Sequence, residues 1–397
     1  MTISETSAIP HGSWVLVTGA NSLVGSNVAD RLLSRGYRVR GTVRNAQRHQ
    51  WMGDLFRDKY GKDSFELVQV QDIQRPGAFD EAMKGVSGVA HVVTIFAGPN
   101  DGPDEIFESI KQLDQNILAS AAAEPSVKRF VYTSSCQAAN TMGLDDLDGK
   151  TVITSDTWNE TAIQRAKTGS PAEWRRGFDI YSASKALGEQ GIWDWVREHK
   201  PGFVANTGKH IFSSAIEIFP SHLNYHVQFY PRCAMVPLST HKIKGFLPHY
   251  HGQQPSSEMI GPQFPNTRRP ISQLVRLNHI RSPERYEEWK LIHPEGGYCV
   301  GIEDAALLHV AALINPTVQN ERLFAYGWPF FWNDLATIYR DIFPNRELPT
   351  DLPGPDKDAD LLDVKPSKRS EDLLKEMGKP GWSSLKEIIV ANAYGLV

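Results

Sequence analysis

Short apolar runs alternate with amphipathic runs through the first half of the chain. The apolar runs have the length of strands and are bounded by turn residues; they lie at 14–17, 38–43, 65–70, 89–95, 130–133 and 203–206. The runs between them predict helices at 27–34, 105–123 and 180–199. Strands that alternate with helices form a parallel sheet covered on both faces. The pattern therefore predicts an α/β fold, a Rossmann-type doubly wound parallel sheet that binds ligands at the carboxyl ends of its strands.

The periodicity is lost after Asn206 and returns near Tyr298. Residues 208–289 are rich in His, Pro, Ser, Gln and Arg and follow neither a helical nor a strand period, which is unusual for so long a stretch inside a compact domain. Beyond it, elements are predicted at 298–300, 305–314, 323–325 and 333–343, and a capping box at Ser384 opens a last helix. We therefore expect three parts: a Rossmann domain at 1–207, an atypical, irregular segment at 208–290, and a smaller substrate lobe at 291–397 with helices that complete the fold.

The composition is that of an ordinary globular protein. The formal net charge of −4 gives no reason to expect a nucleic acid or an anionic membrane as a partner. The three cysteines, Cys136, Cys233 and Cys299, lack the spacing of a metal or redox site, so no metal site is predicted. Neither a signal peptide nor an apolar run of membrane-spanning length is present. A cytoplasmic protein with a small-molecule partner is the simplest expectation, and the oligomeric state stays open.

The first predicted strand runs into a glycine turn that opens a helix. Gly19 allows a tight turn and Gly25 allows the helix to pack close to the sheet, while the N–H groups at the helix start can hold a pyrophosphate. The middle position, usually glycine, is Ser22. An ordinary turn that binds nothing is the alternative. The strand–turn–helix context favours a dinucleotide site made by Gly19, Asn21, Ser22, Leu23, Val24 and Gly25.

The end of the second predicted strand indicates which dinucleotide binds. An NAD-dependent enzyme usually has an acidic residue there for the ribose hydroxyls, whereas this chain has Arg44, with Arg48 close behind. A guanidinium can bind a 2′-phosphate through two hydrogen bonds, so NADP is predicted; otherwise Arg44 is only a solvated charge. Asp72 and Ile73 follow the third strand, where such folds contact the adenine, although Asp72 could equally be a turn residue.

Tyr181 and Lys185 are four residues apart on a predicted helix and so share one of its faces. A free phenol has a pKa of about 10, and a nearby ammonium favours the phenolate and lowers that pKa. Tyr181 could then give a proton to a carbonyl oxygen while a hydride arrives at the carbon. A hydroxyl must also hold that oxygen, and Thr133, Ser134 and Ser135 leave the fifth strand on the cofactor side. Such a pair is common in any helix; its combination with the glycine turn and the strand-end serine favours catalysis.

Together these motifs resemble the extended short-chain dehydrogenases/reductases. Within that family they are most similar to the dihydroflavonol-reductase-like branch and to fungal and yeast NADPH-dependent aldehyde or carbonyl reductases. The resemblance covers roughly residues 12–207 and 298–397, and its motifs are 16–21, 36–44, 127–131, 133–135, 181–185 and 379–382. It implies that Ser135 is the catalytic serine and Tyr181 the proton donor. It also implies that Lys185 binds the nicotinamide ribose and tunes Tyr181, and that Arg44 binds the 2′-phosphate.

The resemblance breaks after Thr207. The family follows its sixth strand with a proline-containing turn against the nicotinamide, whereas this chain continues with Gly208, Lys209 and His210. Residues 208–290 are either a divergent substrate lobe or a translated intron or frame error. The Gly-Lys junction, which is compatible with a splice donor, favours the second interpretation. The segment would then be irregular, the nicotinamide end of the site open or misformed, and activity impaired.

The leading hypothesis is NADPH-dependent reduction of a small aldehyde or ketone to an alcohol. An epimerase or dehydratase would use the same cofactor and the same tyrosine but needs a larger sugar-binding lobe. The aromatic run 328–332 fits an apolar substrate wall better, although core packing explains it more simply. A third hypothesis is an NADP-binding protein without catalysis. The absent turn supports it, and the intact Ser135, Tyr181 and Lys185 oppose it.

Overall fold

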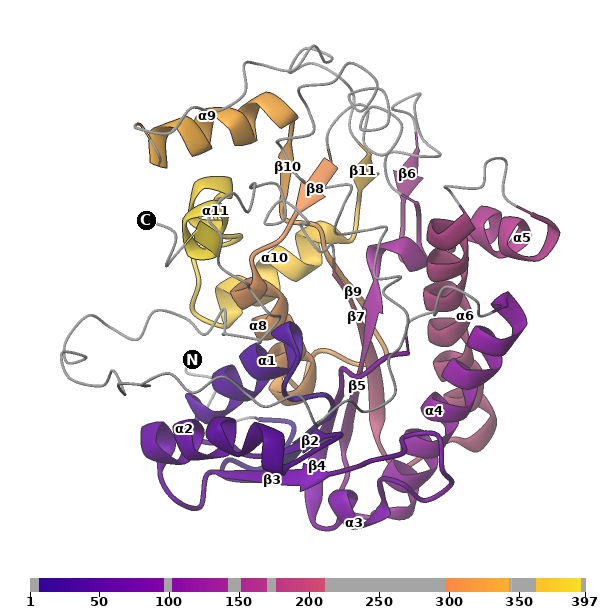
Figure 1. Cartoon of the computed structure of the whole chain (residues 1–397), viewed down its shortest axis with the longest axis vertical. Helices are drawn as coiled ribbons and strands as arrows, with labels where there is room; N and C mark the ends of the chain where they lie inside the picture. The colour runs from indigo at the N-terminus through magenta and orange to yellow at the C-terminus, as the bar shows by residue number, and fades with distance from the viewer. Residues whose placement is uncertain are drawn as a thin grey trace, which may run out of the picture.

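A seven-stranded parallel sheet forms the centre of the computed structural model, which describes residues 7–95, 102–141, 151–169, 176–210, 297–342, 344 and 362–393. The strand order is β3-β2-β1-β4-β5-β7-β9 (Figure 1). Because the order reverses between β1 and β4, the crevice for a ligand is expected outside their carboxyl ends. The predicted Rossmann-type fold is confirmed. The strands are β1 (Trp14–Val17), β2 (Arg38–Val43), β3 (Phe65–Gln69), β4 (Val86–His91), β5 (Arg129–Ser135), β7 (Val204–His210) and β9 (Arg322–Ala325).

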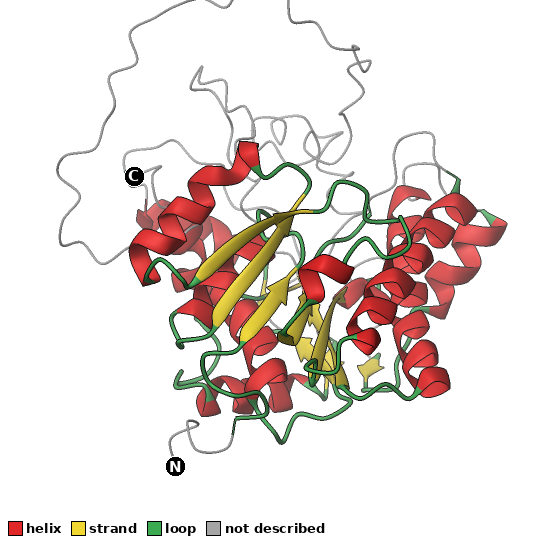
Figure 2. Ribbon diagram, turned by 90° about the horizontal axis from the view of Figure 1, so that it is seen from below, coloured by secondary structure: helices red, strands yellow, loops and turns green. Residues whose placement is uncertain are grey.

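Helices cover both faces of this sheet (Figure 2). One face packs against α1 (Leu23–Leu33), α2 (Gln50–Tyr60), α8 (Ile302–Ile314) and α10 (Ser367–Glu376). The other packs against α3 (Asp80–Met83), α4 (Pro103–Ala123) and α6 (Arg176–His199), and α5 (Glu160–Thr168) lies against α6.

The central strands are apolar on both sides because both sides are covered. In β1, Val15 and Val17 enter the core under α1 and α8, whereas Leu16 enters the core under α4. In β5, Val131 and Phe130 divide between the same two cores. This alternation explains why the strands read as short continuous apolar runs in the sequence.

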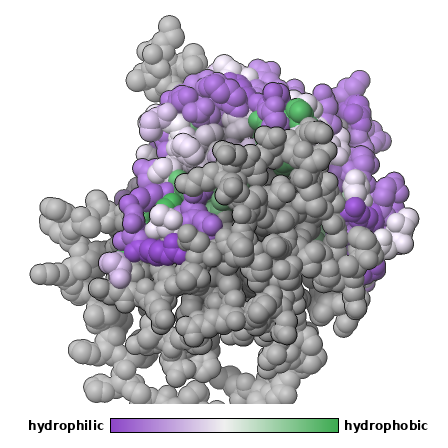
Figure 3. All heavy atoms as spheres, turned by 90° about the horizontal axis from the view of Figure 1, so that it is seen from above, coloured by the Kyte–Doolittle hydropathy of each residue, from purple (hydrophilic) through white to green (hydrophobic). Residues whose placement is uncertain are grey.

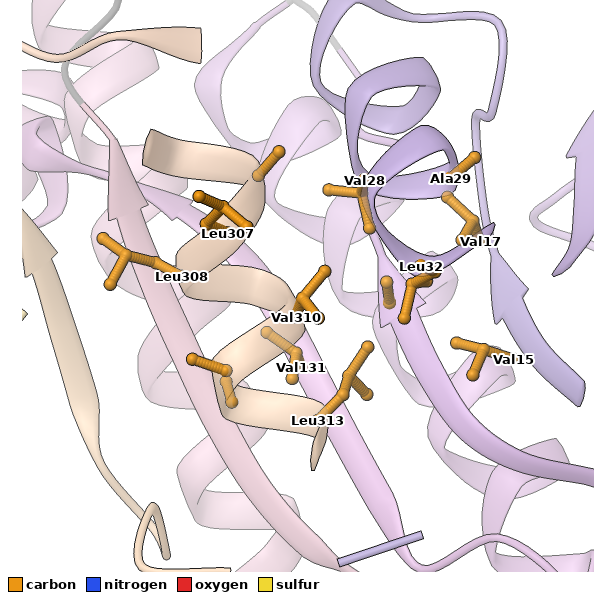
Figure 4. Packing of buried hydrophobic residues seen from close by; sticks show 14 of the residues in the cluster. Val15, Val17, Val28, Ala29, Leu32, Val131, Leu307, Leu308, Val310 and Leu313 are labelled. Atoms are coloured by element: carbon orange, nitrogen blue, oxygen red, sulfur yellow. The ribbon is translucent and has the colours of Figure 1, made fainter. Parts of the chain in front are cut away.

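Helix α8 brings the last quarter of the chain into the core of the first half. Leu313 and Val310 of α8 lie beside Val28 and Leu32 of α1 and above the strands (Figure 4). Leu313, Val28 and Leu32 are all 0% exposed. The sheet and its C-terminal helices therefore share one hydrophobic core.

Smaller elements surround the carboxyl end of the sheet. Strand β10 (Trp328–Phe330) pairs antiparallel with β8 (Gly297–Cys299), and β11 (Asp363–Val364) pairs parallel with β6 (Val152–Ile153). The residues of the aromatic run 328–332 differ in burial, because Phe330 is buried whereas Trp328 is 43% exposed. The remaining elements are the short η2 (Gln47–His49) and η3 (Cys136–Ala138) and the helices α9 (Trp332–Ile342) and α11 (Leu385–Ala393).

The structure extends several predicted elements. Helix α1 begins at Leu23 rather than at residue 27, and β7 continues through His210 rather than ending at residue 206. Residues 208–210, placed in the atypical segment by the sequence, therefore belong to the sheet, where they pair with β5 and β9. The rest of that segment, 211–290, lies outside the described residues, as does Cys233. Helices α2, α5 and α10 were not predicted from the apolar pattern.

One face of the molecule is predominantly polar where its described residues are visible. Seen from above, the described residues that are not covered are mostly hydrophilic, with a few separate hydrophobic ones (Figure 3). Within the described ranges, no helix combines the length and apolarity needed to span a bilayer.

Truncation of the α1–α8 contact tests the shared core. Replacing Leu313 by Ala should lower the free energy of unfolding by about 2–5 kcal/mol, because a fully buried leucine leaves a cavity. Urea denaturation followed by circular dichroism measures this loss. If α8 folded apart from the sheet, the main unfolding midpoint would not change.

Candidate active site

The turn after β1 has the geometry of a phosphate cradle. Gly19 adopts a left-handed φ of +61°, and a Cβ on Gly25 would lie 2.4 Å from the Gly19 carbonyl oxygen. Ser22 caps α1, because its hydroxyl accepts a hydrogen bond from the Gly25 N–H at 3.0 Å. The serine at the usual glycine position thus has a clear structural role. The N–H groups of Leu23 and Val24 come at the helix start, where no intrahelical partner is available for them. The turn fits a pyrophosphate.

Two arginines follow β2 at the same edge of the sheet. Val43 is buried, and Arg44 and Arg48 are exposed directly after it. Both guanidinium groups are thus free to reach a phosphate beside the turn. Past β3, the Asp72 carboxylate accepts the Gln74 N–H at 3.0 Å, which is the geometry of a turn residue. A contact of Asp72 and Ile73 with an adenine stays a prediction.

Each hydroxyl at the end of β5 has a different partner. Thr133 lies 2.8 Å from Nε2 of His309 on α8, and Ser134 donates to Glu189 on α6 at 2.6 Å. Ser135 shares a hydrogen bond with Tyr181. The structure therefore brings together the second serine and the tyrosine that the sequence singled out.

Helix α6 presents Tyr181 and Lys185 on one face. The Lys185 ammonium lies 5.9 Å from the centroid of the Tyr181 ring and donates to the Thr94 hydroxyl at 3.1 Å. Thr94 follows β4, the strand next to β1, and the sequence analysis missed it. Its position after a strand of the sheet was the only signal that could have identified it.

The expected effect of Lys185 on Tyr181 is not what the structure shows. Burial raises the pKa of Tyr181 to about 12, although the hydrogen bond with Ser135 acts to lower it. Lys185 does not lower this pKa, because burial lowers the pKa of its own ammonium to about 8 and Lys185 is therefore already neutral at the pH where Tyr181 would ionise. Tyr181 is therefore protonated at neutral pH, which is the form that a proton donor requires.

Two acidic groups support the charge of Lys185. Asp114 on α4 and Glu189 on α6 both raise the pKa of this buried ammonium, against the larger effect of burial. Asp114 is itself buried, and its carboxylate lies 3.3 Å from Nε2 of His91. These acidic groups thus favour the charged form of Lys185 beside Thr94 and Tyr181.

Several buried polar residues near the site were missed by the sequence analysis. Glu189 follows Lys185 by four residues, so its helical spacing was a usable signal. Lys209 and His210 lie on β7 beside Ser134 and Ser135, in a stretch that the sequence analysis treated as irregular. His210 lies 3.2 Å from His309, and burial lowers the pKa of His309 to about 4. Burial also lowers the pKa of His210, so both imidazoles are neutral.

Comparison with known proteins agrees with this geometry. The NAD dependent epimerase/dehydratase family matches residues 15–215. The chain belongs to this family. It is 33% identical over 98% of its length to the NAD-dependent epimerase/dehydratase terH of Aspergillus terreus, of which 97% is covered. It is also 30% identical over 97% of its length to aldehyde reductase 2 of Sporidiobolus salmonicolor, of which 96% is covered.

Solved structures share the fold of this family member. Gre2 of Candida albicans, in a complex with NADPH, has a TM-score of 0.64 at 20% identity, over 96% of this chain and 97% of that one. Vestitone reductase from alfalfa has a TM-score of 0.59 at 18% identity, over 96% of each chain. The predicted family, the dependence on a nicotinamide dinucleotide and the oxidoreductase class are confirmed. The alignments with terH and with aldehyde reductase 2 include the parts of this chain before and after residues 208–290.

The pKa of Lys185 predicts a pH dependence. The value of kcat/KM for the reduced cofactor reports the free enzyme, so it should fall as the pH rises through about 8, where Lys185 loses its proton. Tyr181, with a pKa of about 12, should not titrate in this range. Initial rates between neutral and alkaline pH measure the profile. Lys185→Arg, which keeps its charge, should lose this decline; an unchanged alkaline limb in that variant would assign the titration to another group, such as Lys209.

Proposed function

We propose that the protein reduces a small aldehyde or ketone to an alcohol with NADPH. The observation that carries this proposal is the hydrogen bond between Ser135 and Tyr181, with Lys185 on the same helix face. These groups lie at the carboxyl edge of the sheet, where the turn after β1 also lies. The name of aldehyde reductase 2, a relative at 30% identity, supports the same reaction class.

NADPH is favoured over NADH by the charges after β2. Arg44 and Arg48 are exposed there, and residues 41–49 contain no carboxylate that would bind ribose hydroxyls or repel a 2′-phosphate. Arg44 is proposed to bind the 2′-phosphate, and the start of α1 to bind the pyrophosphate. Lys185 is proposed to bind the nicotinamide ribose.

The residues of the site suit reduction of a carbonyl group. When bound, the nicotinamide supplies a hydride to the carbonyl carbon. Ser135 holds the carbonyl oxygen through its hydroxyl, and Tyr181 transfers its phenolic proton to that oxygen as the negative charge develops. The carbonyl thus gains one hydride and one proton and becomes an alcohol. Lys185, charged below a pKa of about 8, stabilises the phenolate that remains until solvent returns the proton.

A second candidate is an epimerase or dehydratase reaction. The relative terH, which is 33% identical to this chain, is named an epimerase/dehydratase. Such a reaction would use the same Tyr181. The two functions differ in cofactor balance, because an epimerase regenerates its dinucleotide in each cycle, whereas a reductase consumes NADPH. Net oxidation of NADPH in step with alcohol formation would support reduction, and turnover of a nucleotide sugar without net oxidation would support the alternative.

Replacement of Arg44 by Ala tests the cofactor assignment. NADPH binding should weaken by about 1.5–3 kcal/mol, the size of a charge-assisted hydrogen bond, while NADH binding should hardly change. Fluorescence titration with each dinucleotide measures both affinities. Equal affinity of the unmodified protein for NADH and NADPH would remove Arg44 from this role.

Replacement of Tyr181 by Phe tests the proton donor. The ring stays but the proton is lost, so kcat should fall by about 100- to 10,000-fold, the usual contribution of general acid catalysis. NADPH affinity should stay near that of the unmodified protein, which controls for folding. Reduction of a carbonyl substrate at a near-normal rate by this variant would exclude Tyr181 as the donor.

A further inference from the structure

Glu189 lies on the same face of α6 as the two catalytic candidates, four residues beyond Lys185 and eight beyond Tyr181. Its side chain is completely buried, with 0% exposure. A carboxylate without water is costly unless it is paired and fully hydrogen-bonded. The surroundings of Glu189 must therefore supply its partners.

Four donors from three neighbouring strands satisfy this carboxylate. Oε1 accepts from the Thr207 hydroxyl at 2.7 Å and from Nε of Arg322 at 2.9 Å. Oε2 accepts from the Ser134 hydroxyl at 2.6 Å and from the Lys209 ammonium at 2.5 Å. Each oxygen thus binds one hydroxyl and one cation, which uses the four acceptor positions of a carboxylate. The donors come from β5, β7 and β9.

The two cations also contact residues other than Glu189. The Arg322 guanidinium lies 3.5 Å from the ring centroid of Trp158 and donates to the Thr157 carbonyl oxygen at 3.1 Å. The Lys209 ammonium lies 5.0 Å from the Trp158 ring and 5.1 Å from the Phe324 ring. Both cations thus have contacts that bring them to the Glu189 carboxylate. The two cations hold the pKa of Glu189 down at about 2, so it is ionised at any working pH.

We propose that Glu189 is a positioning residue for the proposed reduction: by binding Ser134 on β5 and Thr207 and Lys209 on β7, it fixes α6 against the strand ends and thereby fixes Tyr181 relative to Ser135. The inference rests on the proposed function. Ser134 is the chain neighbour of Ser135, so the same carboxylate links the helix of the proton donor to the strand of the serine. Displacement of a reacting group by about 1 Å can cost about 100-fold in rate.

Glu189→Gln, which keeps the shape but removes the charge, tests this role. We expect kcat to fall by about 100-fold while the KM for the carbonyl and the affinity for NADPH change by less than about threefold. Asp30→Asn is the matched control, because Asp30 on α1 accepts from Lys59 and Tyr60 at 2.7 Å each and touches no catalytic group. This control should lose thermal stability but keep kcat within about threefold of the unmodified protein.

A pH profile separates positioning from general destabilisation. The titratable groups that interact with Lys185 are Asp114 on α4, His210 on β7, and Tyr181 and Glu189 on α6. Loss of the Glu189 charge should move the alkaline limb of kcat/KM to lower pH, whereas Asp30→Asn should leave that limb in place.

If Glu189→Gln does not fold, Ser134→Ala removes only the link to β5, and its kcat should fall by about tenfold without a change in KM. If Glu189→Gln, or Ser134→Ala in its place, folds and has a kcat within threefold of that of the unmodified protein, the proposal is wrong.

A structural measurement keeps the two proposals distinguishable. If no carbonyl compound supports NADPH oxidation by the unmodified protein, the proposed function is wrong. The positioning role of Glu189 is then tested by crystal structures. Structures of the unmodified protein and of Glu189→Gln, each with NADPH, should show the Ser135–Tyr181 hydrogen bond only in the former. If the bond is the same in both, Glu189 does not position Tyr181.

Discussion

Because the seven strands of the sheet are parallel, their carboxyl ends meet along one edge, and the candidate functional groups of the described residues come from that edge or from the helix beside it. β1 delivers the phosphate-binding turn, β2 delivers Arg44, β4 delivers Thr94 and β5 delivers Ser135. A reversal of strand order between β1 and β4 opens the crevice into which a dinucleotide can enter. The chemistry is thus a consequence of topology before it is a consequence of any single side chain.

Helix α6 has to bring charged and polar groups to this edge without leaving them unpaired. Tyr181, Lys185 and Glu189 follow one another along its buried face, and each finds its partners on a strand end or directly after one. Burial sets their ionisation: it keeps Tyr181 protonated and brings the pKa of Lys185 to about 8. The same burial would make these groups costly if Glu189 and Asp114 did not balance the cation.

The sheet could be predicted from the sequence because its strands are apolar on both faces, as in β1 and β5. Helix α2 could not, because only Met52, Gly53 and Phe56 of its residues are buried and most of the others are polar. The end of β7 was unpredictable for a different reason: its polar residues find their partners in the fold, Lys209 in Glu189, 20 residues earlier, and His210 in His309, 99 residues later. Spacing alone placed Tyr181 and Lys185 on one face, but it could not reveal how burial changes their pKa values.

Reduction of carbonyl compounds with NADPH is the activity that we propose for this site. The most direct measurement is the absorbance of NADPH in the presence of the full-length protein and a panel of aldehydes, ketones and keto esters, with the alcohol quantified in parallel. We expect at least one carbonyl compound to cause consumption of NADPH in a one-to-one ratio with the alcohol formed, and NADH to be consumed far more slowly. Tight NADPH binding without oxidation by any member of the panel would contradict this proposal.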